Sequence, residues 1–219
     1  MDDYSGRVRV GGPADTRRLE GLEISKVAVG PMDNNAYVLR CPRTGEAVLI
    51  DAADDAQRLL EVVPAGALRT VVTTHQHADH WQALAAVVQA TGARTVAHPL
   101  DAAALPVPPD RLVTDGDSVP VGAASLSVIH LRGHTPGSIT LRYDDPAGGT
   151  HLFTGDSLFP GGVGNTRGDA QAFDQLIRGV QAKLFDVLPD DSWVYPGHGA
   201  DTTLGAERPA LPHWRARGW

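Results

Sequence analysis

Apolar and polar residues alternate with two different periods in the first half of the chain. Residues 48–50 are continuously apolar and residues 69–74 are rich in β-branched side chains, so both segments predict strands. After each strand, apolar residues recur every three or four positions. This spacing predicts helices over residues 56–63 and from about Asp79 to Gly92. The apolar face predicted for the second helix comprises Trp81, Leu84, Ala85 and Val88.

The second half of the chain predicts further strands and one long helix. Residues 126–131 alternate in polarity, and residues 138–143 and 151–154 predict strands joined by a polar turn. A last short strand is predicted at residues 193–195. Because strands that are neighbours in the chain usually pair, the pattern predicts an α/β protein with two packed sheets covered by helices. The stripe of the long helix comprises Phe173, Leu176, Ile177, Val180, Leu184, Val187 and Leu188.

Length, charge and cysteine content narrow the class of protein. We expect a single domain over residues 21–219, preceded by a polar arm, residues 1–20, that is either loose or adds an edge strand. Lys and Arg number 19 against 26 Asp and Glu, and the net charge of -7 argues against nucleic-acid or polybasic membrane surfaces. Cys41 has no partner for an internal disulfide, and no run approaches the roughly 18 apolar residues of a membrane helix. Since the first residues also lack a secretory signal, we expect a cytoplasmic protein.

A histidine-rich segment directly follows the strand predicted at residues 69–74. It reads Thr-His-Gln-His-Ala-Asp-His at residues 74–80. In an extended segment His75 and His77 point to the same side, so both imidazoles can bind one cation. Asp79 and His80 then turn away and can reach a second cation. A polar loop that is histidine-rich by chance is the alternative, but it gives no reason for three His and one Asp within six residues.

Three weaker segments add further ligand types. His134, Asp156 and His198 each lie beside glycine in a tight segment after a predicted strand. Each alone is typical of a turn or cap residue. All three lie at the carboxyl ends of predicted strands, where the sites of α/β proteins gather. Together with the first segment they supply five His and two Asp, which is the inventory of a site for two metal ions.

From about residue 22 to residue 200, the order of these motifs resembles the metallo-β-lactamase-fold superfamily. The resemblance implies a four-layer αββα sandwich with the metals at the edge between its two sheets. It assigns the bridging carboxylate to Asp156, a position that is usually Cys or Ser in true β-lactamases. It also implies two further sets of ligands: His75, His77 and His134 for the first metal, and Asp79, His80 and His198 for the second.

Within the superfamily the chain is most similar to the glyoxalase II-like hydrolases. Residues 32–37, Met-Asp-Asn-Asn-Ala-Tyr, and residues 155–159, Gly-Asp-Ser-Leu-Phe, resemble segments of that group. The Cys-Gly-Arg part of the group's substrate loop is replaced by Gly-Gly-Val-Gly-Asn-Thr-Arg at residues 161–167. Few residues follow His198, so we also expect no counterpart of the C-terminal helical domain that contacts glutathione.

The resemblance implies hydrolysis of a thioester of a small cellular thiol, such as glutathione, mycothiol, bacillithiol or coenzyme A. Two divalent cations, most plausibly zinc but also iron or manganese, would provide hydroxide at neutral pH, and we assign a catalytic role to Asp79. One alternative is a persulfide dioxygenase with a single iron on His75, His134 and Asp156. Lactone or phosphodiester hydrolysis shares the ligand set. A non-catalytic member of the fold would have lost several ligands, whereas all seven positions here carry ligating residue types.

Substrate contacts and partners are harder to infer. Tyr37 is either a core residue or part of the site lining. Phe159, Asn165 and Arg167 follow the bridging Asp in a glycine-rich stretch that could close over a substrate, where Arg167 could meet a carboxylate. We expect a small-molecule substrate, with no nucleic acid and no membrane as partner. The aromatic and basic tail, residues 212–219, could pack on the domain or form a homodimer.

Overall fold

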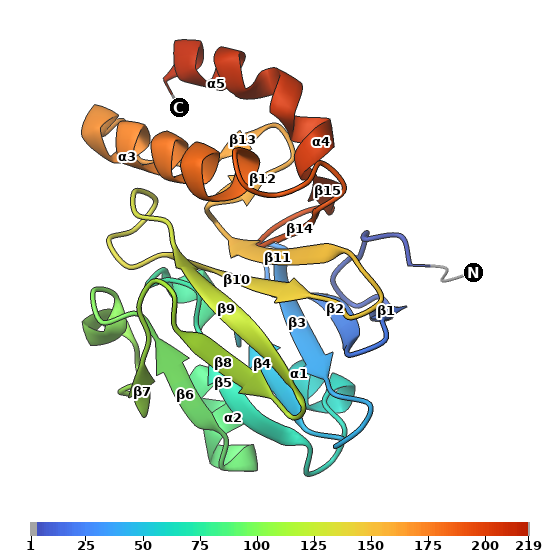
Figure 1. Cartoon of the computed structure of the whole chain (residues 1–219). Coiled ribbons are helices and arrows are strands. Elements are labelled where there is room, and N and C mark those ends of the chain that lie inside the picture. The colour runs from blue at the N-terminus through green and yellow to red at the C-terminus, as the bar shows by residue number, and fades with distance from the viewer. Residues whose placement is uncertain (1–3, 219) are drawn as a thin grey trace.

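Two β-sheets packed face to face form the centre of the molecule (Figure 1). The computed structural model describes residues 4–218. The first sheet has seven strands, antiparallel from β1 to β4 and parallel from β4 to β7. In spatial order these are β1 (Asp15–Arg18), β2 (Glu23–Val29), β3 (Asn34–Arg40), β4 (Ala47–Ile50), β5 (Leu68–Val72), β6 (Arg94–Ala97) and β7 (Arg111–Leu112).

The second sheet has six strands, and a separate two-stranded hairpin lies beside it. All neighbours in this sheet are antiparallel except the parallel pair of β11 and β14. In spatial order the strands are β15 (Thr202–Thr203), β14 (Trp193–Pro196), β11 (Thr150–Gly155), β10 (Ile139–Asp144), β9 (Ala124–His130) and β8 (Ser118–Val121). The hairpin consists of β12 (Leu158–Phe159) and β13 (Gly162–Val163).

Helices cover the outer face of each sheet, which completes the four-layer αββα sandwich implied by the sequence (Figure 1). Two helices, α1 (Ala56–Val62) and α2 (Leu84–Thr91), pack on the first sheet. The second sheet is covered by α3 (Ala170–Val180), a π-helical turn (Gln181–Phe185), α4 (Leu204–Glu207) and α5 (Leu211–Arg217). Short 3₁₀ turns occur at Ala78–His80, Ala102–Ala104 and Arg208–Ala210.

Alternation along the strands divides the core into three layers. In β4, Val48 and Ile50 face the layer between the sheets, whereas Leu49 faces α1 and α2. In β11, Phe153 faces the layer between the sheets and Leu152 faces α3 and α5. Both faces of these central strands are therefore buried, which explains why β4 is continuously apolar and why Leu152 and Phe153 are adjacent apolar residues in β11.

Two predicted apolar faces differ from the structure. Residues 78–80 form a 3₁₀ turn, so α2 begins at Leu84 rather than near Asp79, and its buried residues are Leu84 and Val87 while Ala85 is exposed. In the long helix, α3 passes into a π-helical turn at Gln181, which changes the angular spacing of the residues that follow. As a result Val187 is 65% exposed, and its predicted place in the core is wrong.

The segment before residue 21 is packed on the domain where the structure describes it. Asp15–Arg18 forms β1 at the edge of the first sheet, in antiparallel register with β2. The hydroxyl of Tyr4 donates a hydrogen bond of 2.6 Å to Asp201. Of the two alternatives for this segment, the structure shows the edge strand; residues 1–3 lie outside the described part of the chain.

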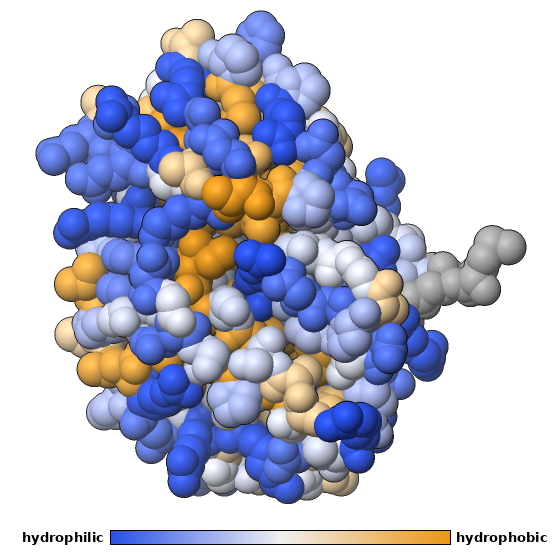
Figure 2. Space-filling model, viewed as in Figure 1, coloured by the Kyte–Doolittle hydropathy of each residue, from blue (hydrophilic) through white to orange (hydrophobic). Residues whose placement is uncertain are grey.

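Polar and charged residues cover most of the face drawn in Figure 2, and the apolar areas between them are small. The large apolar side chains with the greatest exposure are Val10, Met32, Leu100, Leu112 and Val187. Among residues 4–218, no helix has the length together with the apolar character that crossing a bilayer would require.

Candidate metal centre

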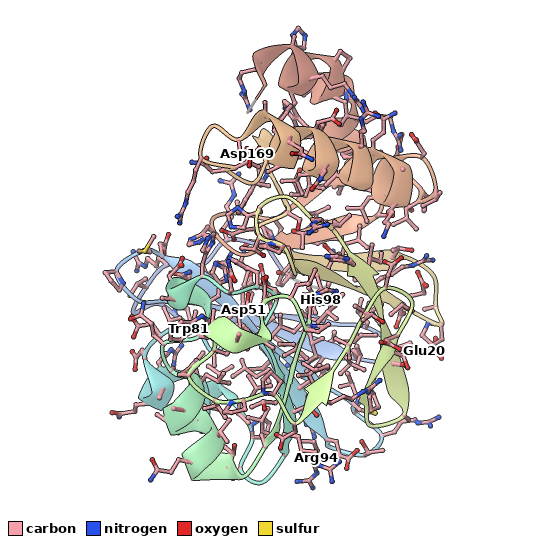
Figure 3. All side chains as sticks on the ribbon, turned by 90° about the vertical axis from the view of Figure 1, so that its left-hand side faces the viewer. Glu20, Asp51, Trp81, Arg94, His98 and Asp169 are labelled. Atoms are coloured by element: carbon pink, nitrogen blue, oxygen red, sulfur yellow. The ribbon has the colours of Figure 1, made fainter. Side chains whose placement is uncertain are left out.

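Four loops bring the predicted ligands to one edge of the sandwich. They follow β5, β9, β11 and β14, and each leaves its strand at the carboxyl end. This is the edge at which sites of α/β proteins are usually built. Figure 3 views the molecule from this side, with Asp51 at the end of β4 and Asp169 at the start of α3. Residues from both sheets therefore contribute to one cluster.

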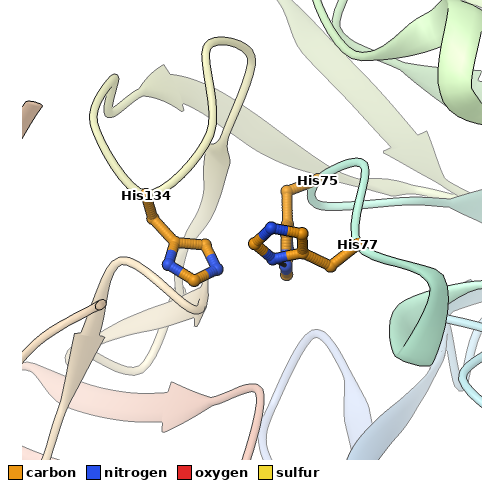
Figure 4. A group of neighbouring side chains, drawn as sticks. All are labelled: His75, His77 and His134. Carbon is orange, nitrogen blue, oxygen red and sulfur yellow. Dashed lines mark hydrogen bonds between the residues drawn. The ribbon is translucent and has the colours of Figure 1, made fainter. Parts of the chain in front are cut away.

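The first group of ligand types consists of His75, His77 and His134, whose rings face one another (Figure 4). Ring centroids of His75 and His77 lie 4.9 Å apart, and those of His77 and His134 lie 4.6 Å apart. Nε2 of His75 is 3.1 Å from Nδ1 of His77, so these two atoms point at the same space. One loop after β5 and one loop after β9 are thus enough to surround a small cation.

The second group consists of Asp79, His80 and His198 and shares no residue with the first. Oδ2 of Asp79 lies 3.6 Å from Nε2 of His80 and 3.3 Å from Nε2 of His198. The 3₁₀ turn at Ala78–His80 lets Asp79 and His80 turn away from His77. This separation within one short segment was anticipated from the sequence.

Asp156 lies between the two groups. Its Oδ2 atom is 3.5 Å from Nε2 of His134 in the first group and 3.7 Å from Nε2 of His198 in the second. Its Oδ1 atom is 3.3 Å from Nε2 of His80. The carboxylate can therefore reach ligands of both groups, as a bridging residue must.

Three buried polar atoms in this cluster have no hydrogen-bond partner among residues 4–218. They are Nε2 of His80, Nε2 of His134 and Oδ1 of Asp156. Although His80 and Asp156 approach to 3.3 Å, their relative orientation makes no hydrogen bond. Leaving such atoms unsatisfied in the interior costs about 1–3 kcal/mol each. A divalent cation satisfies nitrogen and carboxylate donors of this kind, so the residues present fit a metal centre.

Three of the histidines are held in place through Nδ1, which leaves Nε2 facing the cluster. Nδ1 of His134 lies 2.9 Å from the carbonyl of Asn165, and Nδ1 of His198 lies 3.1 Å from the carbonyl of Met32. Nδ1 of His80 lies 2.8 Å from the carboxylate of Asp51. Outer contacts of this type fix the ring and its tautomer, which strengthens metal binding.

Asp51 is a supporting residue that the sequence analysis did not single out. It accepts hydrogen bonds from the backbone N–H and the hydroxyl of Thr74, at 2.7 and 2.8 Å, as well as contacting His80. The hydroxyl of Thr74 in turn lies 3.0 Å from Nδ1 of His75. One buried carboxylate thus orients a ligand of each group. Its position directly after a buried strand was the available signal.

Asp101 is a second supporting residue, and it connects two ligand-bearing loops. Its carboxylate accepts hydrogen bonds from the N–H of Gln76, the hydroxyl of Thr135 and the N–H of Gly137. The loop after β5 and the loop after β9 are therefore fixed relative to each other. No motif or periodicity around Asp101 indicates this role, because all three partners are distant in the sequence.

The pKa values of the ligands follow from burial and from the charges nearby. Burial lowers the pKa of His75, His77 and His134, so these imidazoles are neutral and able to bind a cation at neutral pH. Burial also opposes the charge of His80, but Asp51 and Asp156 outweigh it and raise the pKa of His80 to about 10. In the metal-free protein His80 therefore carries a proton that it must lose to act as a ligand.

Asp79 is ionised at neutral pH. Burial raises its pKa, but the hydrogen bond from Asn34 and the charge of His80 outweigh burial, and the net shift of the Asp79 pKa is downward. The amide of Asn34 donates to Oδ2 of Asp79 at 2.9 Å. Asn34 lies in the early segment, residues 32–37, that carried part of the resemblance, and the structure shows what it contacts.

The four residues predicted to contact a substrate lie in three different places in the structure. Tyr37 is 2% exposed and donates its hydroxyl to the carbonyl of Pro196, so of its two alternatives the core position is observed. The ring of Phe159 lies 6.3 Å from that of His198, at the margin of the cluster. Asn165 and Arg167 lie in the loop before α3, where Arg167 approaches His77.

Comparisons with known proteins agree with this geometry. Residues 29–198 match the family model described as Metallo-beta-lactamase superfamily. A hydroxyacylglutathione hydrolase of Polaromonas sp. is 39% identical over 171 residues, which are 75% of this chain and 62% of that relative. The chain thus spans less than two thirds of the length of this curated relative.

Two solved structures are similar over most of both chains. The di-iron-bound form of TTHA1623 is 32% identical with a TM-score of 0.70, covering 86% of this chain and 98% of that one. ETHE1 from Myxococcus xanthus is 30% identical with a TM-score of 0.74, covering 88% and 84%. The chain therefore belongs to the metallo-beta-lactamase superfamily.

Proposed function

We propose that the chain is a dinuclear metal-dependent hydrolase that cleaves thioesters of a small cellular thiol. The position of Asp156 carries this proposal, because its carboxylate lies within 3.7 Å of imidazoles from two ligand groups that share no residue. The similarity to a di-iron-bound structure and to a hydroxyacylglutathione hydrolase supports it.

The residues around the cluster have separate roles in this mechanism. His75, His77 and His134 would hold one divalent cation, Asp79, His80 and His198 the other, and Asp156 both. Cations bound there would supply Lewis acidity, which lowers the pKa of a coordinated water and polarises a carbonyl oxygen. Asn34 holds Asp79 in place through the 2.9 Å hydrogen bond to Oδ2, and Asp79 remains ionised as a ligand and proton acceptor. Asp51 orients His80 and, through Thr74, His75.

A thioester suits this set of residues. Its thiolate leaves without a proton, so the reaction needs no general acid beside the leaving group. The hairpin of β12 and β13 lies next to the cluster and brings Phe159 to its margin. Because residues 161–167 differ from the Cys-Gly-Arg loop of glyoxalase II, we infer that the thiol need not be glutathione.

Thiol release from a panel of thioesters tests the proposal. The panel contains S-D-lactoylglutathione, its mycothiol and bacillithiol counterparts and an acyl-coenzyme A. We expect release that stops with a chelator and returns with added zinc or iron, and the best substrate identifies the thiol. Absence of release from every member, with folded and metal-loaded protein, would reject thioester hydrolysis.

A second candidate function is a persulfide dioxygenase with one iron on His75, His134 and Asp156. The similarity to ETHE1 from Myxococcus xanthus is consistent with it. It differs from the first candidate in the number of metal ions per chain, which is one instead of two. It also differs in the second substrate, which is oxygen instead of water. Oxygen uptake in the presence of a thiol persulfide by a protein with one iron per chain would favour this function, whereas two zinc ions per chain and no oxygen uptake would reject it.

A further inference from the structure

We propose that Arg167 and the Nε2 side of His77 together bind a carboxylate of the substrate beside the metal centre. This inference rests on the proposed function, because it assigns a chemical feature to the substrate that the same site would cleave. It starts from the contact of these two side chains, in which NH2 of Arg167 lies 3.4 Å from Nε2 of His77.

The turn that carries Arg167 is tied down at both ends. At its start, the carbonyl of Asn165 lies 2.9 Å from Nδ1 of His134, and the side-chain oxygen of Asn165 accepts from the N–H of Arg167 at 2.7 Å. At its end, the N–H of Asp169 donates to the carbonyl of Thr166, and the carboxylate of Asp169 caps α3. These contacts fix the backbone from which the side chain of Arg167 extends toward His77.

Arg167 adopts a backbone conformation that a long side chain rarely takes. Its φ is 54°, in the left-handed region, whereas Gly168 next to it has a φ of 81° at no steric cost. Arginine at such a position costs of order 1 kcal/mol, and strained residues of this kind gather at functional sites. The left-handed turn keeps the arginine close to His77.

When Nδ1 of His77 binds a cation, the contact between Arg167 and His77 brings two hydrogen-bond donors together. His77 turns Nδ1 toward the cluster, 3.1 Å from Nε2 of His75. A neutral imidazole has one N–H group, so when Nδ1 serves as a metal ligand the proton is on Nε2. Guanidinium has donors only. Nε2–H of His77 and NH2 of Arg167 thus face the same space without an acceptor, and a carboxylate would accept from both.

No acidic side chain neutralises Arg167. Within residues 4–218, its guanidinium forms no ion pair with a carboxylate, and its side-chain contact is with His77. By contrast, Arg178 on α3 pairs with Asp174 at 2.8 Å. The planar guanidinium of Arg167, with donors that form no ion pair among the described residues, binds a carboxylate more strongly than a neutral group.

Matched pairs of thioesters test this assignment and show which half of the substrate carries the carboxylate. One pair places it on the thiol half: S-lactoyl-N-acetylcysteine and its primary amide. The other places it on the acyl half: S-succinyl-N-acetylcysteamine and the S-butyryl compound. We expect the protein to prefer the charged member of one pair by about 10- to 100-fold in KM. Arg167→Gln should remove this preference with kcat retained, and Arg167→Lys should restore part of it.

Arg178→Gln is the matched control, because it removes the same charge from an exposed side chain outside the cluster. It should leave the preference unchanged. Equal KM values for charged and neutral members of both pairs would overturn the proposal, and so would equal losses in the Arg167→Gln and Arg178→Gln proteins. Zinc content measured by mass spectrometry should be the same in all variants.

A binding measurement separates this inference from the proposed function. Calorimetric titration of the zinc-loaded protein with succinate and with succinamide requires no turnover. We expect succinate to bind at least about tenfold more weakly to Arg167→Gln than to the unaltered protein or Arg178→Gln. Equal succinate binding by all three proteins would overturn the carboxylate site. If this difference is found but no thioester is cleaved, the carboxylate site stands and the proposed hydrolysis is rejected.

Discussion

Two of the buried polar clusters in the described part of the chain differ in whether their donors and acceptors find hydrogen-bond partners. The open cluster is the metal centre, where Nε2 of His80, Nε2 of His134 and Oδ1 of Asp156 lack hydrogen-bond partners. The closed cluster surrounds the ion pair of Lys26 and Asp201, whose side chains are 0% and 1% exposed. Both lie close to the loop after β14, which carries His198 and Asp201.

In the closed cluster every donor of Lys26 has an acceptor. Its Nζ donates to the carbonyls of Gly6 and Gly199 and to Oδ1 of Asp201, at 2.9, 2.7 and 2.6 Å. The other carboxylate oxygen of Asp201 accepts from Tyr4 and Trp193. Burial lowers the pKa of Lys26 and raises that of Asp201, so each charge depends on the other.

The difference shows what each cluster is for. In the closed cluster the hydrogen-bonding groups of Lys26 and Asp201 are satisfied within the protein, so no ligand is required. The cluster stabilises one arrangement of the N-terminal segment and the loop after β14. An open cluster made of ligating residues is costly unless a further group completes it. We therefore interpret the first as structural and the second as a site that cations complete.

Removing one ligand of the open cluster should have the largest effect on activity and little effect on folding. We expect Asp79→Ala to lower thiol release on the order of 10³-fold, because the second ligand group loses its carboxylate. The free energy of unfolding of the metal-free protein should be nearly unchanged, as judged by urea denaturation. Full activity in this variant would refute the metal-dependent mechanism.

Removing one residue of the closed cluster should instead have its largest effect on the free energy of unfolding. Lys26→Met leaves Asp201 buried without its partner, and we expect a loss of about 3–5 kcal/mol in the free energy of unfolding. The double variant Lys26→Met, Asp201→Leu should lose less, because no unpaired charge remains. Urea denaturation of the three proteins checks this, and a double variant less stable than Lys26→Met would contradict the role assigned to the pair.

Lowering the pH should weaken the region next to the closed cluster through His151. The hydroxyl of Tyr195 lies 3.0 Å from Nδ1 of His151 and accepts from Arg17. Burial, followed by the charge of Arg17, lowers the pKa of His151 to about 4. The neutral form is therefore favoured by folding, and the stability it contributes is complete above a pH of about 6.5 and lost as the pH falls toward 4.

The expected loss over this range is about 3 kcal/mol for this side chain. His151→Gln has no group that titrates there, so the difference between its stability curve and that of the unaltered protein isolates the effect. The two curves should diverge between pH 6.5 and 4. Parallel curves would show that His151 does not resist protonation in the fold.

A smaller effect is expected when a support of the open cluster is changed without touching a ligand. Asp51→Asn weakens the hold on His80 and on Thr74, and we expect zinc affinity to fall about 10- to 100-fold. Competition with a chromogenic chelator measures this affinity. Asp55→Asn is the control, since asparagine can also serve as the N-cap of α1. Equal affinities in the two variants would remove Asp51 from its assigned role.

The two clusters also differ in how well the sequence predicts them. The open cluster is encoded by local motifs, since His75, His77, Asp79 and His80 lie within one short segment. The layers of the core follow from the continuous apolar run of β4 and from the adjacent Leu152 and Phe153 of β11, strands that are buried on both faces. The family resemblance then places the remaining ligands.

The closed cluster has no such local signal. Lys26 occupies a position of β2 between Ile24 and Ala28, where a lysine would be expected to reach solvent. Its partner Asp201 follows 175 residues later, and a single sequence does not connect the two. The same reason explains why Asp101 was not predicted and why Tyr37 was left open between the core and the site lining. These roles depend on contacts between distant segments.

The number of cations bound per chain tests the central claim most directly. Native mass spectrometry of the metal-free protein titrated with zinc gives this number for each species. The account predicts two zinc ions at saturation for the unaltered protein and one for Asp79→Ala. A maximum of one zinc ion in the unaltered protein would contradict the assignment of two ligand groups bridged by Asp156.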